Sequence, residues 1–505
     1  MADSLASFAK RIGLSDSHAK ALQSQHGSSW SNDTQPDENL KIACQVAQLI
    51  LGLDQVETSP VNQTIVKENW SLACVAQPYC VFLPRNSSDV SKILQIIDYF
   101  KIKFAVRSGG HSPNPGWSSI DSSGILVSLE RLNQVTLSDD KSVASVGPGG
   151  RWGDVDATLT PFNVTVLGGR AGPVGVGGLL LGGGYHYLAA EHGLSADNVK
   201  NFEIVLADGN ITNANATDNS DLFWALKGGG PNFGIVTRYD LYTYPLTATW
   251  LQLGIYPIDQ AQKTLEAFAT WQKDGGSNPK SNVILTITLD AVIIGLTYNE
   301  PLSGPPDVFA PFSELTPLQM LIPPSNNTFS IIYEIGNSIL PAEHLRHDYR
   351  GVASQVDAQL YIDVYNFWRE KALDVRNSTG ADQAFVLQHV PESLVAQGIA
   401  KGGNALNIPQ FTHQWWTTLV DWTNAKDDDV VRSVAIDTTA KWKELSAERG
   451  LDVAFLYMND ASRDQNPIAT YGIDNVNKLK SIAQKYDKSG LFQTQQNGGF
   501  LLSKV

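Results

Sequence analysis

Residues 107–115 read Arg-Ser-Gly-Gly-His-Ser-Pro-Asn-Pro and follow a short apolar segment, Phe104-Ala-Val106, that is typical of a β-strand. The two glycines permit positive φ angles and a close approach of the backbone to a ligand. The imidazole of His111 follows them directly, so backbone N–H donors and a nucleophilic ring lie in one loop. By itself the loop fits two interpretations: a tight turn with an incidental histidine, or a loop that binds a phosphate-bearing cofactor.

A second glycine-rich stretch favours the cofactor interpretation. It reads Gly168-Gly-Arg-Ala-Gly-Pro-Val-Gly-Val-Gly-Gly178, followed by Leu179-Leu-Leu-Gly-Gly-Gly184. Ordering glycine costs backbone entropy, and the interspersed valines and leucines differ from a polar linker, so backbone packed against a ligand is expected. The stretch shows neither a Gly-x-Gly-x-x-Gly fingerprint after a strand nor the Gly-Lys-Ser/Thr of a P-loop.

Composition limits the class of partner. The 505 residues are 42% hydrophobic and 17% charged, which describes a globular chain with an ample core. Lys plus Arg is 37 and Asp plus Glu is 51, so the net charge is 37 − 51 = −14. This acidic balance disfavours nucleic acids and anionic membranes as partners, and no apolar run approaches the ~18 residues of a membrane span. We expect a small-molecule substrate and a monomer.

The sequence leaves the cellular compartment open. Its three cysteines, Cys44, Cys74 and Cys80, allow one disulfide and one free thiol in an exported protein, or three buried thiols in a cytosolic one. No signal peptide is evident at the N-terminus, and no cysteine or histidine spacing predicts a metal site. Nine Asn-x-Ser/Thr sequons fit a secreted glycoprotein or chance: Asn32, Asn62, Asn69, Asn86, Asn163, Asn210, Asn215, Asn326 and Asn377.

The chain divides into four segments by composition. Residues 1–58 are a helical preface, and residues 59–245 combine short strands with glycine turns. Residues 246–450 carry less glycine and more strands and long helices, and residues 451–505 resemble residues 59–245 again. Hairpins and helices in this order predict an α+β fold.

Within the third segment, residues 283–289 and 292–298 predict a β-hairpin, and residues 342–352 predict a helix. The sequence His413-Gln-Trp-Trp416 is rich in aromatic residues. It fits either a buried core or one wall of an apolar substrate pocket.

Five motifs, taken together and in order, resemble the FAD-linked oxidases of the vanillyl-alcohol-oxidase superfamily, and among them the berberine-bridge-enzyme-like group in its fungal form. The motifs cover about residues 40–245 and 450–495: Arg107–His111, Gly172–Gly178, Gly182–Gly184 with Gly193–Val199, Asp221–Gly230, and Tyr471-Gly472 with Asp487–Phe492. The resemblance implies a bipartite PCMH-type FAD-binding domain, made of residues 59–245 and 451–505. It also implies an inserted substrate domain, residues 246–450, built as an antiparallel sheet covered by helices.

The resemblance further implies that His111 bonds covalently to the 8α-methyl group of FAD. Many relatives form a second bond through a cysteine, and because Ala171 stands at that position, we expect attachment through His111 alone. The resemblance also implies a Cys44–Cys80 disulfide, a free Cys74, and access of dioxygen past Val174. The residues expected to contact FAD are His111, Arg107, Ser108, Gly109, Gly110, Ser112, Gly172, Val174, Gly175, Gly177, Gly178, Gly184, Asp197, Asn198, Val199, Ile235 and Val236.

The implied reaction moves a hydride from a small substrate to flavin N5, and dioxygen is then reduced to hydrogen peroxide. The expected base is Tyr457, Asp460 or His413, in that order. Relatives often read Tyr-x-Asn-Tyr-x-Asp where this chain has Phe455-Leu-Tyr-Met-Asn-Asp460, so their tyrosine-assisted step does not transfer directly.

The tryptophan-rich insert favours an aromatic or apolar natural product as the substrate. Two further enzyme classes remain as alternatives: a redox-neutral cyclase or isomerase in secondary metabolism, and a carbohydrate oxidase. A binding protein that has kept the fold without the chemistry is the non-enzymatic alternative.

Overall fold

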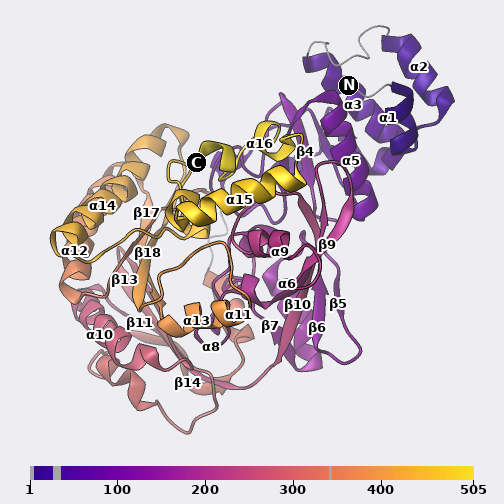
Figure 1. Ribbon diagram of the computed structural model, residues 1–505. Coiled ribbons are helices and arrows are strands. Elements are labelled where there is room, and N and C mark those ends of the chain that lie inside the picture. The colour runs from indigo at the N-terminus through magenta and orange to yellow at the C-terminus, as the bar shows by residue number, and fades with distance from the viewer. Residues whose placement is uncertain (1–4, 27–35, 340–343) are drawn as a thin grey trace.

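The computed structural model describes residues 5–26, 36–339 and 344–505, which form three β-sheets with helices packed around them (Figure 1). The mixture of sheets and helices confirms the α+β class. The helices outside the third sheet are α1 (Leu5–Ile12), α2 (Asp16–His26), α3 (Pro36–Leu51), α4 (Gln63–Val66), α5 (Ser87–Phe100), α6 (Trp152–Leu159), α7 (Val176–Leu181), α8 (Ala189–His192), α9 (Ser220–Leu226), α15 (Ile473–Tyr486) and α16 (Leu491–Thr494).

The first sheet has four strands, and its edge strand β3 leads into the His111 loop. The strand order is β1 (Val56–Thr58), β2 (Cys80–Phe82), β4 (Gly124–Ser128) and β3 (Lys103–Arg107). Strands β2, β4 and β3 are parallel, whereas β1 is antiparallel to β2. Helix α5 connects β2 to β3 and buries an apolar face that includes Val90, Ile93, Leu94 and Ile97. Parallel strands need such a crossover because they run in the same direction, and β2 and β3 both pair with β4, which lies between them.

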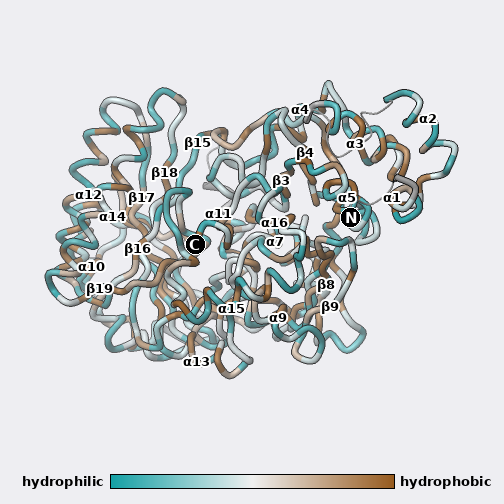
Figure 2. Tube along the Cα trace, turned by 45° about the horizontal axis from the view of Figure 1, so that its top comes forward, coloured by the Kyte–Doolittle hydropathy of each residue, from teal (hydrophilic) through white to brown (hydrophobic). Residues whose placement is uncertain are grey.

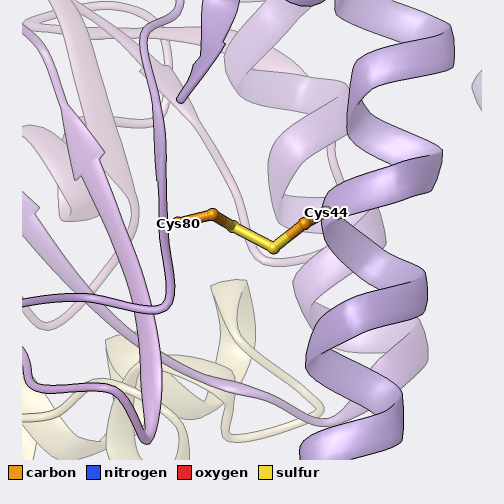
Figure 3. Close-up of a disulfide and its surroundings, with 2 residues drawn as sticks. All are labelled: Cys44 and Cys80. Atoms are coloured by element: carbon orange, nitrogen blue, oxygen red, sulfur yellow. A yellow bond between two sulfur atoms is a disulfide. The ribbon is translucent and has the colours of Figure 1, made fainter. Parts of the chain in front are cut away.

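A disulfide joins α3 to the first sheet. Cys44 of α3 and Cys80 of β2 form the bond, with an S–S distance of 2.06 Å (Figure 3). This confirms the pairing that the family resemblance implied. Cys74 is free, as expected, and it is buried. A disulfide is compatible with passage through the secretory pathway. No helix in the described ranges is long and apolar enough to cross a membrane.

The second sheet is antiparallel and is organised by the long strand β10 (Ile235–Pro245). Its order is β5 (Val135–Leu137), β6 (Val143–Val146), β10, β8 (Val199–Val205) and β9 (Ile211–Asn215), while β7 (Val164–Val166) also pairs with β10. Alternate residues of β10, such as Tyr239 and Leu241, are buried in a core shared with Trp152 of α6. This core supports the second glycine-rich stretch, because Val176 and Leu180 of α7 belong to it.

The third sheet is antiparallel throughout and is covered by helices, as the sequence predicts. Its strands are β11 (Thr249–Pro257), β12 (Ser281–Thr288), β13 (Ala291–Tyr298), β14 (Gln319–Asn327), β15 (Arg346–Asp348), β16 (Gly351–Ser354), β17 (Asp382–Val390), β18 (His413–Trp422) and β19 (Asp452–Val453). Its associated helices are α10 (Ala261–Lys273), α11 (Ser330–Ile339), α12 (Ala358–Thr379), α13 (Glu392–Ala400) and α14 (Asp428–Glu448). The predicted hairpin is β12 and β13.

Aromatic side chains pack the third sheet against two of the helices that cover it. Phe385 of β17 and Trp416 of β18 lie against Trp368 of α12 and Trp442 of α14, with ring centroids 5.5–5.9 Å apart. Large aromatic side chains contribute most of the apolar area that such an interface buries. In Figure 2, hydrophobic brown and hydrophilic teal stretches alternate along the outer helices, as expected for helices with one face against a sheet.

The C-terminal residues return to the first sheet. After β19, the chain passes through α15 and α16 and then pairs with the edge of β3, where the amide of Phe104 donates to the carbonyl of Gln495. The rings of Phe104 and Phe492 meet edge to face, with centroids 6.0 Å apart. The end of the chain thus covers the strand that leads into the His111 loop.

The boundaries of the four segments predicted from the sequence remain predictions.

The prediction of a helix over residues 342–352 is wrong. Residues 342 and 343 lie outside the described residues, and the described part of this range contains strands. Residues 346–348 and 351–354 are strands β15 and β16, and both pair with β18. Gly351 and the polar run Arg346-His-Asp348 weaken a helix, and pairing with β18 satisfies the backbone hydrogen bonds instead.

Of the sequons, Asn32 lies outside the described residues, and Asn69 is 1% exposed and donates to Ser118, which leaves no room for a glycan.

Candidate active site

The two glycine-rich loops cross at Gly109 and Gly175. A Cβ atom built on Gly109 would lie 2.4 Å from the Cα of Gly175, and one on Gly175 would lie 2.5 Å from the Cα of Gly109. Arg151 clamps the crossing, because its Nη1 donates to the carbonyl oxygens of Gly109 (2.9 Å) and Pro173 (2.6 Å). Both loops therefore need glycine here for close backbone contact with each other.

The His111 ring is held by aromatic neighbours. It stacks on Trp70 with centroids 4.2 Å apart, and Trp70 also stacks on His347 at 3.7 Å. The Tyr349 hydroxyl lies 3.3 Å from Nδ1 of His111. Burial and the nearby charge of Arg151 lower the pKa of His111 to about 3. The ring is therefore neutral at neutral pH, and a neutral imidazole is nucleophilic.

The second imidazole of this stack is itself anchored. His347 Nδ1 lies 2.6 Å from Asp421 Oδ1, and the His347 amide donates to the Ser71 hydroxyl at 2.9 Å. Next to this contact, the amide of Trp70 donates to the carbonyl of Gly110 at 2.9 Å. Residues 70–71 therefore connect the His111 loop to the edge strand β15 of the third sheet.

The donor set fits the FAD that the motifs imply. In the described part of the chain, the amide N–H groups of Gly109, Gly110 and His111 have no hydrogen-bond acceptor. A Cβ atom on Gly178 would meet nothing within 4 Å, so space lies beside the start of α7. Successive amides with positive φ, as at Gly110 (φ +63°), form concavities that suit phosphate or carbonyl oxygens.

Several residues expected to contact FAD have side chains engaged within the protein. The guanidinium of Arg107 is 1% exposed and donates to the Ile65 carbonyl at 2.7 Å, besides pairing with Glu68. The carboxylate of Asp197 accepts from the Leu194 amide and from Asn404. The Asn198 amide group donates to the carbonyls of His192 and Leu194, at 3.0 and 2.8 Å. These side chains shape the site by holding its loops.

The other expected contacts lie around the two loops or on the adjoining strands. Ser108 Oγ donates to the carbonyl of Pro148 and accepts from the Gly177 amide, which ties the loops together. Gly184 has φ +74° and packs against Ser195. The remaining residues are Ser112 and Gly172 in the loops, Val174 packed against the core, and buried Val199, Ile235 and Val236 in β8 and β10.

The three candidate bases differ sharply in their surroundings. Asp460 Oδ2 accepts a 2.6 Å hydrogen bond from Gln388 Nε2, and burial raises the pKa of Asp460 to about 6 although Arg170 opposes this shift. Tyr457 stacks on Trp415 at 4.5 Å, and burial raises the pKa of Tyr457 well above its usual value. Asp460 is therefore the candidate that ionises near neutral pH.

His413 occupies a different position. Its Nδ1 lies 2.7 Å from the Phe411 carbonyl, and its Nε2 accepts from the Trp415 indole N–H at 3.1 Å. Both ring nitrogens are thus engaged, and burial lowers the pKa of His413 to about 4. This arrangement fits a neutral histidine that orients Trp415.

Three residues of the site were not anticipated from the sequence: Tyr349, Gln388 and Arg170. Gln388 links Arg170 to Asp460, because its Oε1 accepts from Arg170 Nη2 while its Nε2 donates to Asp460. Burial raises the pKa of Tyr349, the charge of Asp460 raises it further, and the charge of Arg170 opposes the shift. Arg170 stands directly before Ala171, within a glycine-rich motif that is evident in the sequence, whereas Gln388 and Tyr349 lie in strands and loops of the third sheet with no motif of their own.

Comparison with known proteins agrees with the geometry. Residues 78–215 match the family described as FAD binding domain. The chain is 34% identical over 467 residues to a FAD-dependent monooxygenase of Arthrobotrys oligospora, covering 92% of this chain and 90% of that protein. It is 31% identical over 440 residues to the bifunctional solanapyrone synthase of Alternaria solani, with coverage of 87% and 84%.

Solved structures share the fold at lower identity. The glucooligosaccharide oxidase of Acremonium strictum, which carries a 6-S-cysteinyl, 8α-N1-histidyl FAD, aligns with TM-score 0.75 and 20% identity, covering 91% of this chain and 99% of that one. BBE-like 1 of Physcomitrella patens aligns with TM-score 0.73 and 16% identity, with coverage of 91% and 99%. Fold and relatives together define an FAD-linked oxidoreductase. The chain belongs to the family of the fungal FAD-dependent enzymes that it matches over most of its length, and it has the fold of the FAD-linked oxidases that its motifs resemble.

The crossing of the two loops generates a stability prediction. We expect Gly109→Ala to destabilise the protein by about 1–3 kcal/mol and to lower its flavin content, because backbone atoms on both sides must shift. Gly304→Ala is the matched control, since nothing lies within 4 Å of a Cβ there. Thermal unfolding and the visible absorbance of purified protein measure the two effects. An unchanged unfolding midpoint in Gly109→Ala would contradict the close crossing.

Proposed function

We propose that the protein is an FAD-dependent oxidase that removes a hydride and a proton from a small aromatic or apolar substrate. One molecule of dioxygen takes up both electrons and two protons per turnover, so the balanced reaction is SH2 + O2 → S + H2O2. The observation that supports this proposal best is the convergence of Asp460, Gln388 and Arg170 from the C-terminal segment, β17 and the second glycine-rich loop.

FAD, when bound, would supply the hydride-accepting ring and the site of dioxygen reduction. The loops 107–112 and 172–178 would hold it with backbone amides, and His111 would be its only covalent attachment because Ala171 lacks a thiol. Tyr349 stays protonated, since burial raises its pKa, and its hydroxyl can therefore donate to His111 Nδ1 and fix the ring. Residues 59–245 with 451–505 would form the FAD-binding part, and residues 246–450 the substrate side.

Asp460 is the base in this proposal. Its carboxylate is held by the Gln388 amide, which leaves Oδ1 to accept a proton from a substrate O–H or N–H. A base is most effective when its pKa lies near the working pH, and the pKa of Asp460 is raised to about 6. Tyr457, with a strongly raised pKa, would instead act as a protonated donor, and with Trp415 it would form an aromatic wall for the substrate.

The names of the relatives favour a second candidate. Proteins from Arthrobotrys oligospora and Penicillium terrestre are called FAD-dependent monooxygenases. A monooxygenase would place one oxygen atom of O2 in the product and consume an external reductant, whereas an oxidase does neither. The requirement for a nicotinamide reductant therefore separates the two reactions.

A substrate panel tests the proposal. FAD-loaded protein is mixed anaerobically with aromatic and apolar alcohols, phenols and amines, and the visible flavin band is followed by stopped flow. We expect at least one member to bleach the band without added reductant, and readmitted oxygen to restore it with one equivalent of peroxide. Bleaching only after addition of NADPH would favour the monooxygenase, and a band unchanged by every member, with no peroxide, would contradict the oxidase.

Covalent attachment is tested by acid precipitation. The denatured wild-type protein should retain yellow flavin, whereas His111→Ala should release it into the supernatant, because the proposed bond is made by that ring alone. His347→Ala, which removes the neighbouring ring without removing the nucleophile, serves as the control and should retain covalent flavin. Flavin retained by precipitated His111→Ala would rule out the assignment.

The base assignment predicts a pH dependence. Because Asp460 must be ionised to accept a proton, kcat/KM should rise with pH up to about 6 and level off above it. Asp460→Asn should lower kcat/KM by about 10²–10⁴-fold and abolish this acidic limb. Asp437→Asn, which removes an ion pair with Lys371 on the outer helices, should leave the profile unchanged. An acidic limb that persists in Asp460→Asn would assign the base elsewhere.

A further inference from the structure

Arg170 carries a charge that the protein itself does not neutralise by an ion pair. Its side chain is half-buried between the second glycine-rich loop and β17, and its guanidinium carbon lies 4.8 Å from the ring centroid of Tyr185. Within the described ranges, no carboxylate oxygen lies within 4 Å of it. By contrast, the other half-buried or buried arginines of the site region, Arg107 and Arg151, both pair with Glu68.

Among the residues that the structure describes, the one hydrogen-bond partner of the Arg170 guanidinium is neutral. Nη2 donates to Gln388 Oε1, and a guanidinium has five N–H donors, so four remain for another acceptor. The neighbouring phenols do not compete for them, because Tyr185 donates to the His389 carbonyl and Tyr187 donates to the backbone carbonyl of Arg170. Burial also raises the pKa of both phenols to about 12, so neither supplies a negative charge.

Gln388 keeps the cation and the nearby carboxylate apart. One amide group accepts from Arg170 and donates to Asp460, and these two residues form no ion pair with each other. A carboxylate bound directly to Arg170 would neutralise it as an anion receptor and would itself be a weaker base. The Gln388 amide thus keeps a positively charged guanidinium and a negatively charged carboxylate in one site without a direct ion pair between them.

We propose that Arg170 binds an acidic oxygen of the substrate, so that the substrate class is a small aromatic or apolar molecule bearing a carboxylate or an ionised enol or phenol. The planar fork of a guanidinium matches such oxygens with two parallel hydrogen bonds. The rings of Tyr185, Trp415 and Tyr457 would contact the apolar body. This inference rests on the proposed function only in taking the bound anion to be the molecule that is oxidised. Neutral oligosaccharides carry no negative charge that would neutralise this arginine.

Binding of matched probes tests the proposal without turnover. FAD-loaded protein is titrated with benzoate and with its neutral isostere benzamide, by equilibrium dialysis and by the change in the flavin spectrum. We expect wild type to prefer benzoate by about tenfold or more, since a carboxylate accepts two parallel hydrogen bonds from the guanidinium and neutralises its charge, whereas an amide oxygen does not. Arg170→Met should reduce the preference to within about twofold.

Two further variants keep the test decisive. Gln388→Glu retains the guanidinium but places a carboxylate beside it, so it should also remove the preference even if Arg170→Met fails to fold. Arg238→Met, which removes a guanidinium of β10 that pairs with Glu203 and Asp240, should keep the wild-type preference. A preference for benzoate that survives in both Arg170→Met and Gln388→Glu would overturn the proposal.

A second pair of probes distinguishes an ionised enol from a carboxylate as the group that Arg170 binds. 1,3-Cyclohexanedione, which ionises as an enol, is compared with cyclohexanone. A preference for the acidic member of either pair that depends on Arg170 supports the subsite and names its oxyanion, and a preference in neither pair overturns it. Because these are binding measurements, an Arg170-dependent preference in a protein that never forms peroxide would uphold the subsite while the oxidase proposal fails.

Discussion

The close contact between the backbones of Gly109 and Gly175 is the constraint on which the rest of the site depends. Neither loop can carry a side chain at that point, and Arg151 fixes both loops by bonding a carbonyl from each. The contact determines where the amides of residues 109–111 point, and it brings the loop that carries Arg170 toward the third sheet. One backbone crossing therefore positions the cofactor side and part of the substrate side together.

The third sheet contributes to the same site from the opposite direction. Strand β15 brings His347, and the connection from β15 to β16 brings Tyr349, toward His111; Trp70 stacks on both imidazoles. Strand β17 supplies Gln388, and the segment after β19 supplies Asp460. The charged and aromatic groups of the site thus come from parts of the chain that are distant in sequence. One core joins these parts, since it includes Leu180 of α7, Trp415 of β18 and Tyr457.

Prediction from sequence succeeded where a feature depends on local sequence. The β12–β13 hairpin has a pattern within a few consecutive residues, and the α+β class and the family could be predicted from several such local patterns taken in order. The link between Gln388 and Asp460 could not, since it depends on the register of β17 in the third sheet. The same reason explains the wrong helix at 346–352, where pairing with β18 outweighs local preference. Arg107 and Asp197 show the converse, because motif residues expected to contact FAD have side chains bonded within the protein.

The edge of β3 has a consequence for the order of synthesis. The amide of Phe104 donates to the carbonyl of Gln495, and the amide of Asn497 donates back to the carbonyl of Phe104, only a few residues before the His111 loop. These partners leave the ribosome long after the strand that they pair with, because most of the chain lies between them. Until then, the strand leading to the loop has an unpaired edge. The strand before the His111 loop therefore acquires this support only when residues 495–497 have been synthesised.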